Sequence, residues 1–225
     1  AGLNLAGASA SQSLRQEVVM EGKQDQTIAT VDIDGLVSPE HVTLMRSLCN
    51  KAIHDDNIRA VLLRVNTPGG SVAPCDQIHG ILRDFKLSTN KPVIVSMGSV
   101  AASGGYYISA IADEIVAEET TVTGSIGVIA SYPILEGALD KIGVDMLIVR
   151  SNQAKAWKAA PNAFEQPAEH QIAELQQVLD DMHTRFENIV RSGRAGKLNT
   201  RTEDNTYTGP DGEEYVVRNE TEPFN

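Results

Sequence analysis

The stretch that decides the fold runs from residue 92 to residue 127. It contains Pro92-Val-Ile-Val-Ser-Met-Gly98, Ala101-Ala-Ser-Gly-Gly-Tyr-Tyr107 and Thr123-Gly-Ser-Ile-Gly127. The β-branched run at its start predicts a buried strand, and the apolar residues 106–112 predict a short helix. Ser103 lies between them, where backbone amides and the helix dipole can support a nucleophile. On its own, this glycine-rich turn is equally consistent with close packing.

The rest of the chain alternates predicted strands and helices. Strands are expected at 27–34, 60–65, 93–95, 114–117 and 145–149, and helices at 39–54, 71–85, 135–141 and 166–190. Ser38 and Pro39 are a favourable start for the first of these helices. Such alternation implies right-handed crossovers, and hence an α/β fold with a mostly parallel sheet flanked by helices.

Three regions are expected along the chain. Residues 1–26 would form an N-terminal arm behind a membrane anchor that has been removed, since the chain begins without Met. Residues 27–192 would form the principal domain. Residues 193–225 are expected to be a polar, acidic tail, disordered or cut short, with Tyr215-Val-Val217 as its only strand-like fragment.

Composition narrows the possible functions. The chain has 225 residues and a formal net charge of −11, which argues against nucleic acid as a partner. No run approaches the ~18 apolar residues of a membrane span. The two cysteines, Cys49 and Cys75, are expected to be buried and unpaired. No Cys/His cluster has metal-ligand spacing, so neither a metal nor a cofactor is expected.

Three glycine-bearing turns each follow a predicted strand. They are Pro68-Gly69-Gly70, Ser103-Gly104-Gly105 and Thr123-Gly124-Ser125. The carboxyl ends of parallel strands meet at one edge of a sheet, which is where ligands bind. Two such turns can supply the pair of N–H groups of an oxyanion hole, and the third can supply a hydroxyl.

This combination resembles the signal peptide peptidase A family (protease IV, short bacterial form), over roughly residues 27–190. The resemblance rests on Asn66-Thr-Pro-Gly-Gly-Ser-Val72, Ala102-Ser-Gly-Gly-Tyr-Tyr107 and Thr123-Gly-Ser-Ile-Gly127. It implies the repeated ββα superhelix shared with the Clp protease and crotonase. It also implies a serine endopeptidase that hydrolyses remnant signal peptides and other apolar peptides through an acyl-enzyme.

The resemblance also assigns the site. It makes Ser103 the nucleophile, Lys155 the general base and Ser125 the hydroxyl that holds the lysine. The oxyanion donors would be the N–H groups of Gly70 and Gly104. Lysine is a base only when neutral, and apolar surroundings lower its pKa toward working pH. Ala154, Ala156 and Trp157 provide a less polar setting than an ordinary surface.

Several alternatives stay open. Lys158 lies three residues beyond Lys155 and is a second candidate base. A Ser-His-Asp triad is disfavoured because there is no Gly-x-Ser-x-Gly elbow. Asn66 and Tyr107 are candidates for supporting the site, although turn-forming and packing roles are favoured for both. Asp32 and Asp34 are expected to be structural.

Residues 193–225 lack the closing helix and strand of the family, so a non-catalytic oligomeric scaffold or binding module of the same fold is the main alternative. Acyl-CoA chemistry is a weaker one. The resemblance further implies a homo-oligomer at the cytoplasmic membrane, with its catalytic domain on the extracytoplasmic side.

Overall fold

The computed structural model describes residues 2–6, 15–23, 25–149, 152, 162–198, 201–208 and 214–221. The chain forms two compact units. The first comprises Ala1–Ile126 with Glu187–Asn225, and the second comprises Gly127–Phe186. The sheet and most of the predicted site residues belong to the first unit.

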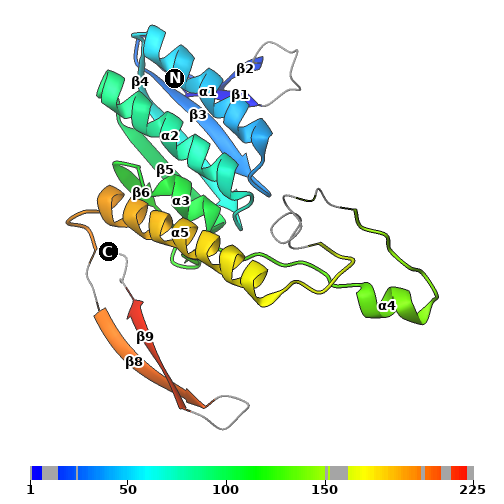
Figure 1. Ribbon diagram of the computed structural model, residues 1–225. Helices are drawn as coiled ribbons and strands as arrows, with labels where there is room; N and C mark the ends of the chain where they lie inside the picture. Colours follow the sequence, from blue (N-terminus) through cyan, green and yellow to red (C-terminus); the bar gives the residue numbers. More distant parts are fainter. Residues whose placement is uncertain are drawn as a thin grey trace. The chain divides into compact units, whose positions relative to one another are not determined.

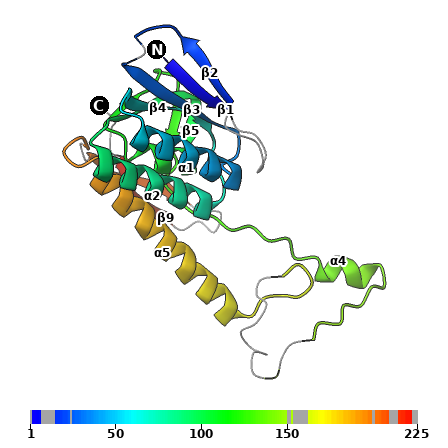
Figure 2. The same ribbon diagram turned by 90° about the horizontal axis from the view of Figure 1, so that it is seen from above.

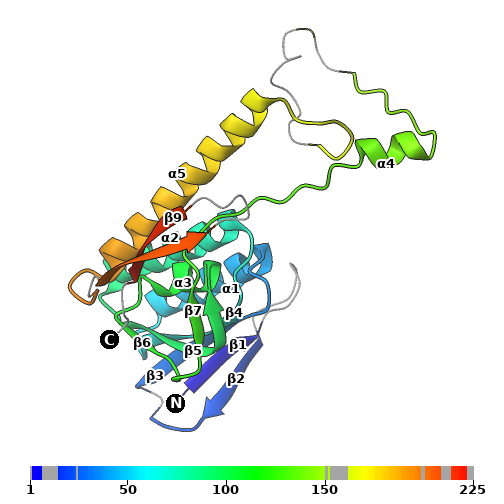
Figure 3. The ribbon, with the colours of Figure 1, turned by 90° about the horizontal axis from the view of Figure 1, so that it is seen from below.

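The first unit is built on a mostly parallel sheet. Its centre is β3 (Thr27–Asp34), β4 (Ile58–Thr67) and β5 (Val93–Ala102), which are parallel neighbours. Both β6 (Glu114–Val116) and β7 (Val122–Gly124) pair parallel with β5 (Figure 3). At the opposite edge, β1 (Gly2–Ala6) is parallel to β3, and β2 (Arg15–Met20) is antiparallel to β1. The predicted α/β architecture is therefore confirmed.

Two helices cover one face of this sheet. Figures 1 and 2 show α1 (Pro39–His54) and α2 (Val72–Thr89) lying side by side across β3 and β4. Their apolar faces meet the strands in a core whose most deeply buried members include Met45, Leu48, Ile78, Leu82, Phe85, Val61 and Leu63. Ser38 is the N-cap of α1, and its N–H donates to Nδ1 of His41 at 3.2 Å. The short helix α3 (Gly104–Ser109) follows β5 directly.

The remaining elements show where sequence patterns were insufficient. Helices α4 (Glu136–Lys141) and α5 (Glu169–Gly193) match their predictions, but residues 145–149 form no strand. Their apolar run suggested one, yet the structure gives them no partner strand, and pairing is what makes an apolar run a strand. Conversely, β8 (Arg201–Thr208) and β9 (Glu214–Thr221) form an antiparallel hairpin. Only 215–217 were predicted there, because β8 is polar throughout.

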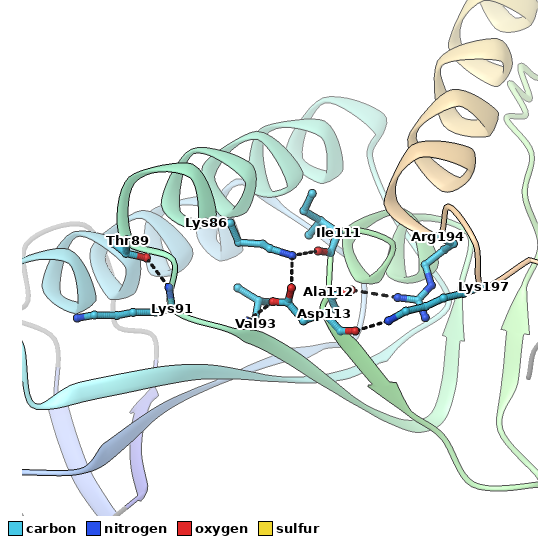
Figure 4. A network of polar contacts seen from close by, with 9 residues as sticks. All are labelled: Lys86, Thr89, Lys91, Val93, Ile111, Ala112, Asp113, Arg194 and Lys197. Atoms are coloured by element: carbon cyan, nitrogen blue, oxygen red, sulfur yellow. Dashed lines mark hydrogen bonds and ion pairs between the residues drawn. The ribbon is translucent and has the colours of Figure 1, made fainter.

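A polar network joins the end of α2 to the segment after α3 and to the end of α5 (Figure 4). Lys86 Nζ donates to Asp113 Oδ1 at 2.7 Å, and the Val93 amide donates to Asp113 Oδ2 at 2.8 Å. The guanidinium of Arg194 donates to the Ala112 carbonyl at 3.0 Å, and Lys197 donates to the Asp113 carbonyl. Burial alone would raise the pKa of Asp113, but hydrogen bonds from Lys86 and Val93 and the charges of Lys86 and Lys197 lower that pKa below its ordinary value of 3.8.

Removing this carboxylate should make stability less dependent on pH. We expect Asp113→Ala to lower the free energy of unfolding at pH 7 by about 1 kcal/mol, since the pair is partly solvent-screened. Because the folded pKa is lowered, the stabilisation is complete above the unfolded value of about 4 and is lost as pH falls through the folded value. Urea unfolding at pH 7 and pH 3 should therefore show a difference that shrinks at pH 3.

Asp84 supplies a matched control for that measurement. It pairs with Arg83 at 2.9 Å, but its side chain is 70% exposed, so Asp84→Ala should change stability little at either pH. A loss from Asp113→Ala that is equal at pH 7 and pH 3 would contradict the expectation.

Candidate active site

Ser103 occupies a sharp turn between β5 and α3. Its φ of 50° and ψ of −116° are values that residues other than glycine seldom adopt. Two backbone hydrogen bonds hold it there: the Ser103 N–H donates to the Gly124 carbonyl at 2.8 Å, and the Tyr107 N–H donates to the Ser103 carbonyl at 2.9 Å. The side chain is half-buried. Backbone strain that is held in place in this manner is characteristic of functional sites.

The second turn follows β4, and backbone hydrogen bonds join it to Val37, two residues before α1. The Val37 N–H donates to the Gly69 carbonyl at 2.9 Å, and the Ser71 N–H donates to the Val37 carbonyl at 3.3 Å. In this parallel bridge, Gly70 stands opposite Val37 and its own N–H points away from it. A Cβ on Gly70 would lie 2.5 Å from both N and O of Val37, so only glycine fits.

The two turns touch each other. A Cβ built on Gly69 would lie 2.9 Å from the Gly104 nitrogen and 3.2 Å from Ser103 Oγ. A Cβ built on Gly104 would lie 3.4 Å from the Gly70 nitrogen. The structure thus brings Ser103, Gly104 and the Gly69–Gly70 turn together, and this approach requires residues without side chains.

Ser125 lies at the end of the neighbouring strand. The register of β5 and β7 pairs Ala102 with Gly124, and the Ser103 N–H donates to the Gly124 carbonyl, so Ser125 directly follows a residue that contacts Ser103 at this sheet edge. Ser125 has a φ of 52° and is exposed. Four of the five predicted site residues therefore gather where β4, β5 and β7 end. The fifth, Lys155, and the alternative Lys158 lie outside the described residues.

The cysteines are poor competitors for nucleophilic chemistry. Both are free and buried, as predicted. Burial raises the pKa of Cys49 to about 12 and that of Cys75 to about 11, so both thiols are protonated at neutral pH. Over the residues that the structure describes, no group of three or more His, Cys, Asp or Glu side chains could hold a metal ion.

Sequence reasoning missed two supports of the site. The buried Thr67 hydroxyl accepts a hydrogen bond from the Gly69 N–H at 3.0 Å and donates to the Gly69 carbonyl at 3.0 Å, which fixes the first turn. Val37 provides the backbone partner described above. Asn66, favoured as a turn residue, donates to Asp34 Oδ1 at 2.7 Å and accepts from the Val100 amide at 3.3 Å. A hydroxyl two residues before a glycine was the one signal available for Thr67.

Comparison with known proteins places this chain in a family. The family model described as peptidase family S49 matches residues 86–218, which is more than half of the chain. The chain therefore belongs to peptidase family S49, as the sequence motifs indicated.

Individual relatives agree with this assignment. Protease 4 of Haemophilus influenzae is 40% identical over 167 residues, covering 72% of this chain and 26% of that protein. The Enterococcus faecium protein named "Putative signal peptide peptidase SppA" is 31% identical over 196 residues, covering 82% of this chain and 56% of that protein. The chain thus spans between about a quarter and somewhat over half of these relatives.

Among solved structures, a point mutant of ClpP1 from Listeria monocytogenes is similar with a TM-score of 0.41 and 16% identity, covering 73% of this chain and 71% of that one. In the part of the chain that is described, no helix is both long and apolar enough to cross a membrane.

Proposed function

We propose that this chain is the catalytic part of a serine endopeptidase with a Ser-Lys dyad. The observation that carries the proposal is the contact between the Gly69–Gly70 turn and Ser103–Gly104. It sets a strained serine beside two backbone amides that can act as oxyanion donors. Membership of peptidase family S49 supports peptide-bond hydrolysis as the reaction.

In the proposed mechanism, Ser103 Oγ attacks the scissile carbonyl carbon while neutral Lys155 takes the hydroxyl proton. The negative charge that develops on the carbonyl oxygen is stabilised by the N–H groups of Gly70 and Gly104. The lysine then gives its proton to the leaving amine, and an acyl-enzyme remains. Water attacks the ester with the same lysine as base, which regenerates Ser103 and releases the second product.

Ser125 is proposed to hold the lysine amine, as the third member of a triad does. Its support is the strand register, which sets Ser125 at the same edge as Ser103. A serine hydroxyl is neutral, so it orients the amine without favouring the charged ammonium form as a carboxylate would. That choice suits a base that has to be neutral at working pH.

We propose remnant signal peptides and other apolar peptides as substrates, in line with the name of the Enterococcus faecium relative. Attachment to the cytoplasmic membrane through an N-terminal anchor, with residues 27–192 as the peptidase domain on the extracytoplasmic side, belongs to the same proposal. These assignments rest on the family alone.

We also propose that the chain forms a homo-oligomer, and the support is a set of exposed apolar side chains in the second unit. None of the described residues between 127 and 149 is buried, although Ile129, Leu147 and Val149 are 90%, 89% and 83% exposed. A contiguous group of exposed apolar side chains marks an interface, and we propose that a second copy of the chain covers these residues. Sedimentation velocity should therefore show an assembly, and a monomer at micromolar concentration would contradict this part of the proposal.

The identity of the base can be tested directly. Intact mass after incubation with a fluorophosphonate probe should show one adduct on the wild type and none on Ser103→Ala. Lys155→Ala should slow labelling by at least about 100-fold, because the serine then lacks its general base. Lys158→Ala is the matched control, since it removes an equal charge three residues away, and it should label at the wild-type rate.

Each other outcome of this experiment has a definite meaning. Slow labelling of Lys158→Ala with normal labelling of Lys155→Ala would move the base to Lys158. If oligomeric wild-type protein forms no adduct, the result would contradict the peptidase proposal and favour a non-catalytic scaffold of the same fold.

A further inference from the structure

Tyr107 and Asp76 join the two helices that begin at the proposed oxyanion donors: α3 starts with Gly104, and α2 starts two residues after Gly70. The Tyr107 hydroxyl, on α3, donates a hydrogen bond to Asp76 Oδ1, on α2, at 2.6 Å. We propose that this contact is a positioning device, which holds the N–H groups of Gly70 and Gly104 at the separation that an oxyanion requires. The inference rests on the proposed peptidase function and adds two residues to it.

Both ends of the contact are coupled to a donor through backbone hydrogen bonds. On α2, Gly70 is followed by the N-cap Ser71, and the Cys75 N–H donates to the Ser71 carbonyl at 3.3 Å, one residue before Asp76. On α3, the Tyr107 N–H donates to the Ser103 carbonyl at 2.9 Å. A rotation of α3 against α2 would therefore change the position of the Gly104 amide relative to the Gly70 amide.

The surroundings of Tyr107 favour a fixed position for its ring. Only 5% of the residue is exposed, and its ring packs edge-on against that of His79 on α2, with centroids 5.7 Å apart and planes at 76°. The distance to Asp76 is typical of an O–H group bonded to a carboxylate, which is stronger than a bond between neutral groups. Cys75, next to Asp76, packs under Gly104, where a Cβ would meet its Sγ at 2.4 Å.

The shortness of α3 makes its direction depend on contacts with its neighbours. The helix has six residues, too few to be stable or rigid by itself, so packing has to set its direction. α2 is three times as long, with 18 residues, and has six buried side chains in its length. The Asp76–Tyr107 bond transfers the rigidity of α2 to the first turn of α3, which carries Ser103 and Gly104.

A positioning role predicts a specific kinetic change. Oxyanion donors act on the transition state and little on the bound substrate, so displacing one lowers kcat and leaves KM nearly unchanged. Tyr107→Phe keeps the ring against His79 and removes only the hydroxyl. With a fluorogenic apolar peptide as substrate, we expect kcat to fall about tenfold and KM to stay within about twofold.

Four further variants separate positioning from simple destabilisation. Asp76→Asn keeps an acceptor oxygen and should retain most of the wild-type kcat, whereas Asp76→Ala should match Tyr107→Phe. The double variant Asp76→Ala/Tyr107→Phe should be no slower than either single one, because in the proposed role both side chains position α3 through the bond between them. Ser109→Ala is the control: it removes the buried bond of 2.7 Å from Ser109 Oγ, at the last residue of α3, to the Gly105 carbonyl, and it leaves the bond to α2 in place. It should lower Tm and leave kcat unchanged.

An unchanged kcat in Tyr107→Phe, or a loss in Ser109→Ala as large as that in Tyr107→Phe, would overturn the positioning role while the peptidase function stood. A wild-type protein that neither cleaves the peptide nor forms a Ser103 adduct with the fluorophosphonate probe would instead overturn the peptidase function, and the positioning role with it.

Discussion

Replacing Ser103 with alanine should abolish peptide hydrolysis, with kcat/KM falling by at least about 10⁴-fold. The proposed reaction passes through an ester on this hydroxyl, and the protonated thiol of Cys75 nearby cannot take its place. Alanine keeps a Cβ at the strained φ of 50°, so the turn gains no new strain. The variant should therefore fold as the wild type does, with a nearly unchanged Tm.

The measurement is the initial rate of cleavage of a fluorogenic apolar peptide, with Tm recorded on the same samples. Ser88→Ala is the matched control. It removes a serine that donates to the Phe85 carbonyl at 3.1 Å near the end of α2, and its activity should equal that of the wild type. Hydrolysis by Ser103→Ala at more than about a hundredth of the wild-type rate would mean that another group is the nucleophile.

The sheet could be predicted from sequence because its strands carry their own signals. β4 contains Ala60-Val-Leu-Leu-Arg-Val65, an apolar run typical of a parallel strand, and Gly or Pro bounds each central strand. The helices α1 and α2 repeat apolar residues at helical spacing. These signals are local, and the structure confirms each of these elements.

The strands that sequence patterns predicted wrongly depend on whether a partner strand is available, rather than on their local sequence. β1 has the sequence Gly-Leu-Asn-Leu-Ala, whose small residues have low strand propensity, yet β3 supplies a parallel partner. β8 is polar from Arg201 to Thr208 and forms a strand opposite β9. Residues 145–149 have the stronger strand pattern and form none. No window of sequence contains the information about which partner is available.

The site residues also fall into two groups, those that the sequence indicated and those that only the structure revealed. Ser103, Gly70, Gly104 and Ser125 could be proposed because each follows a predicted strand and lies in a motif that resembles the signal peptide peptidase A family. Their supports come from other parts of the chain: Val37 precedes α1, and Asp76 lies in α2. Nothing in the residues around them marks these two as neighbours of a catalytic turn, since their roles arise from hydrogen bonds between segments.

Substitution of a glycine in the proposed oxyanion hole should also lower kcat strongly. Gly70→Ala should lower kcat by about 10²–10³-fold, comparable to the loss of one donor. The new Cβ would lie 2.5 Å from the N and O atoms of Val37, so the backbone of the turn has to move and the Gly70 amide moves with it. Gly80→Ala is the control. It lies inside α2 with nothing within 4 Å of its Cβ position, and it should raise stability by about 0.5–1 kcal/mol without changing kcat.

Substitution of Gly104 separates displacement of the oxyanion donor from damage to the fold. The atom nearest to a Cβ added at this position belongs to a side chain, which a second substitution can shorten. Cys75 Sγ lies 2.4 Å from that position, while the nearest backbone atoms are 3.3 and 3.4 Å away. Gly104→Ala should therefore be slow, and Cys75→Ala in the same chain should restore much of its kcat by removing the sulfur. No truncation of a side chain can restore Gly70→Ala in this way, since its obstacle is the backbone of Val37. Equal rescue of both variants by Cys75→Ala, or wild-type kcat in Gly70→Ala, would show that the two amides do not contact the reacting carbonyl.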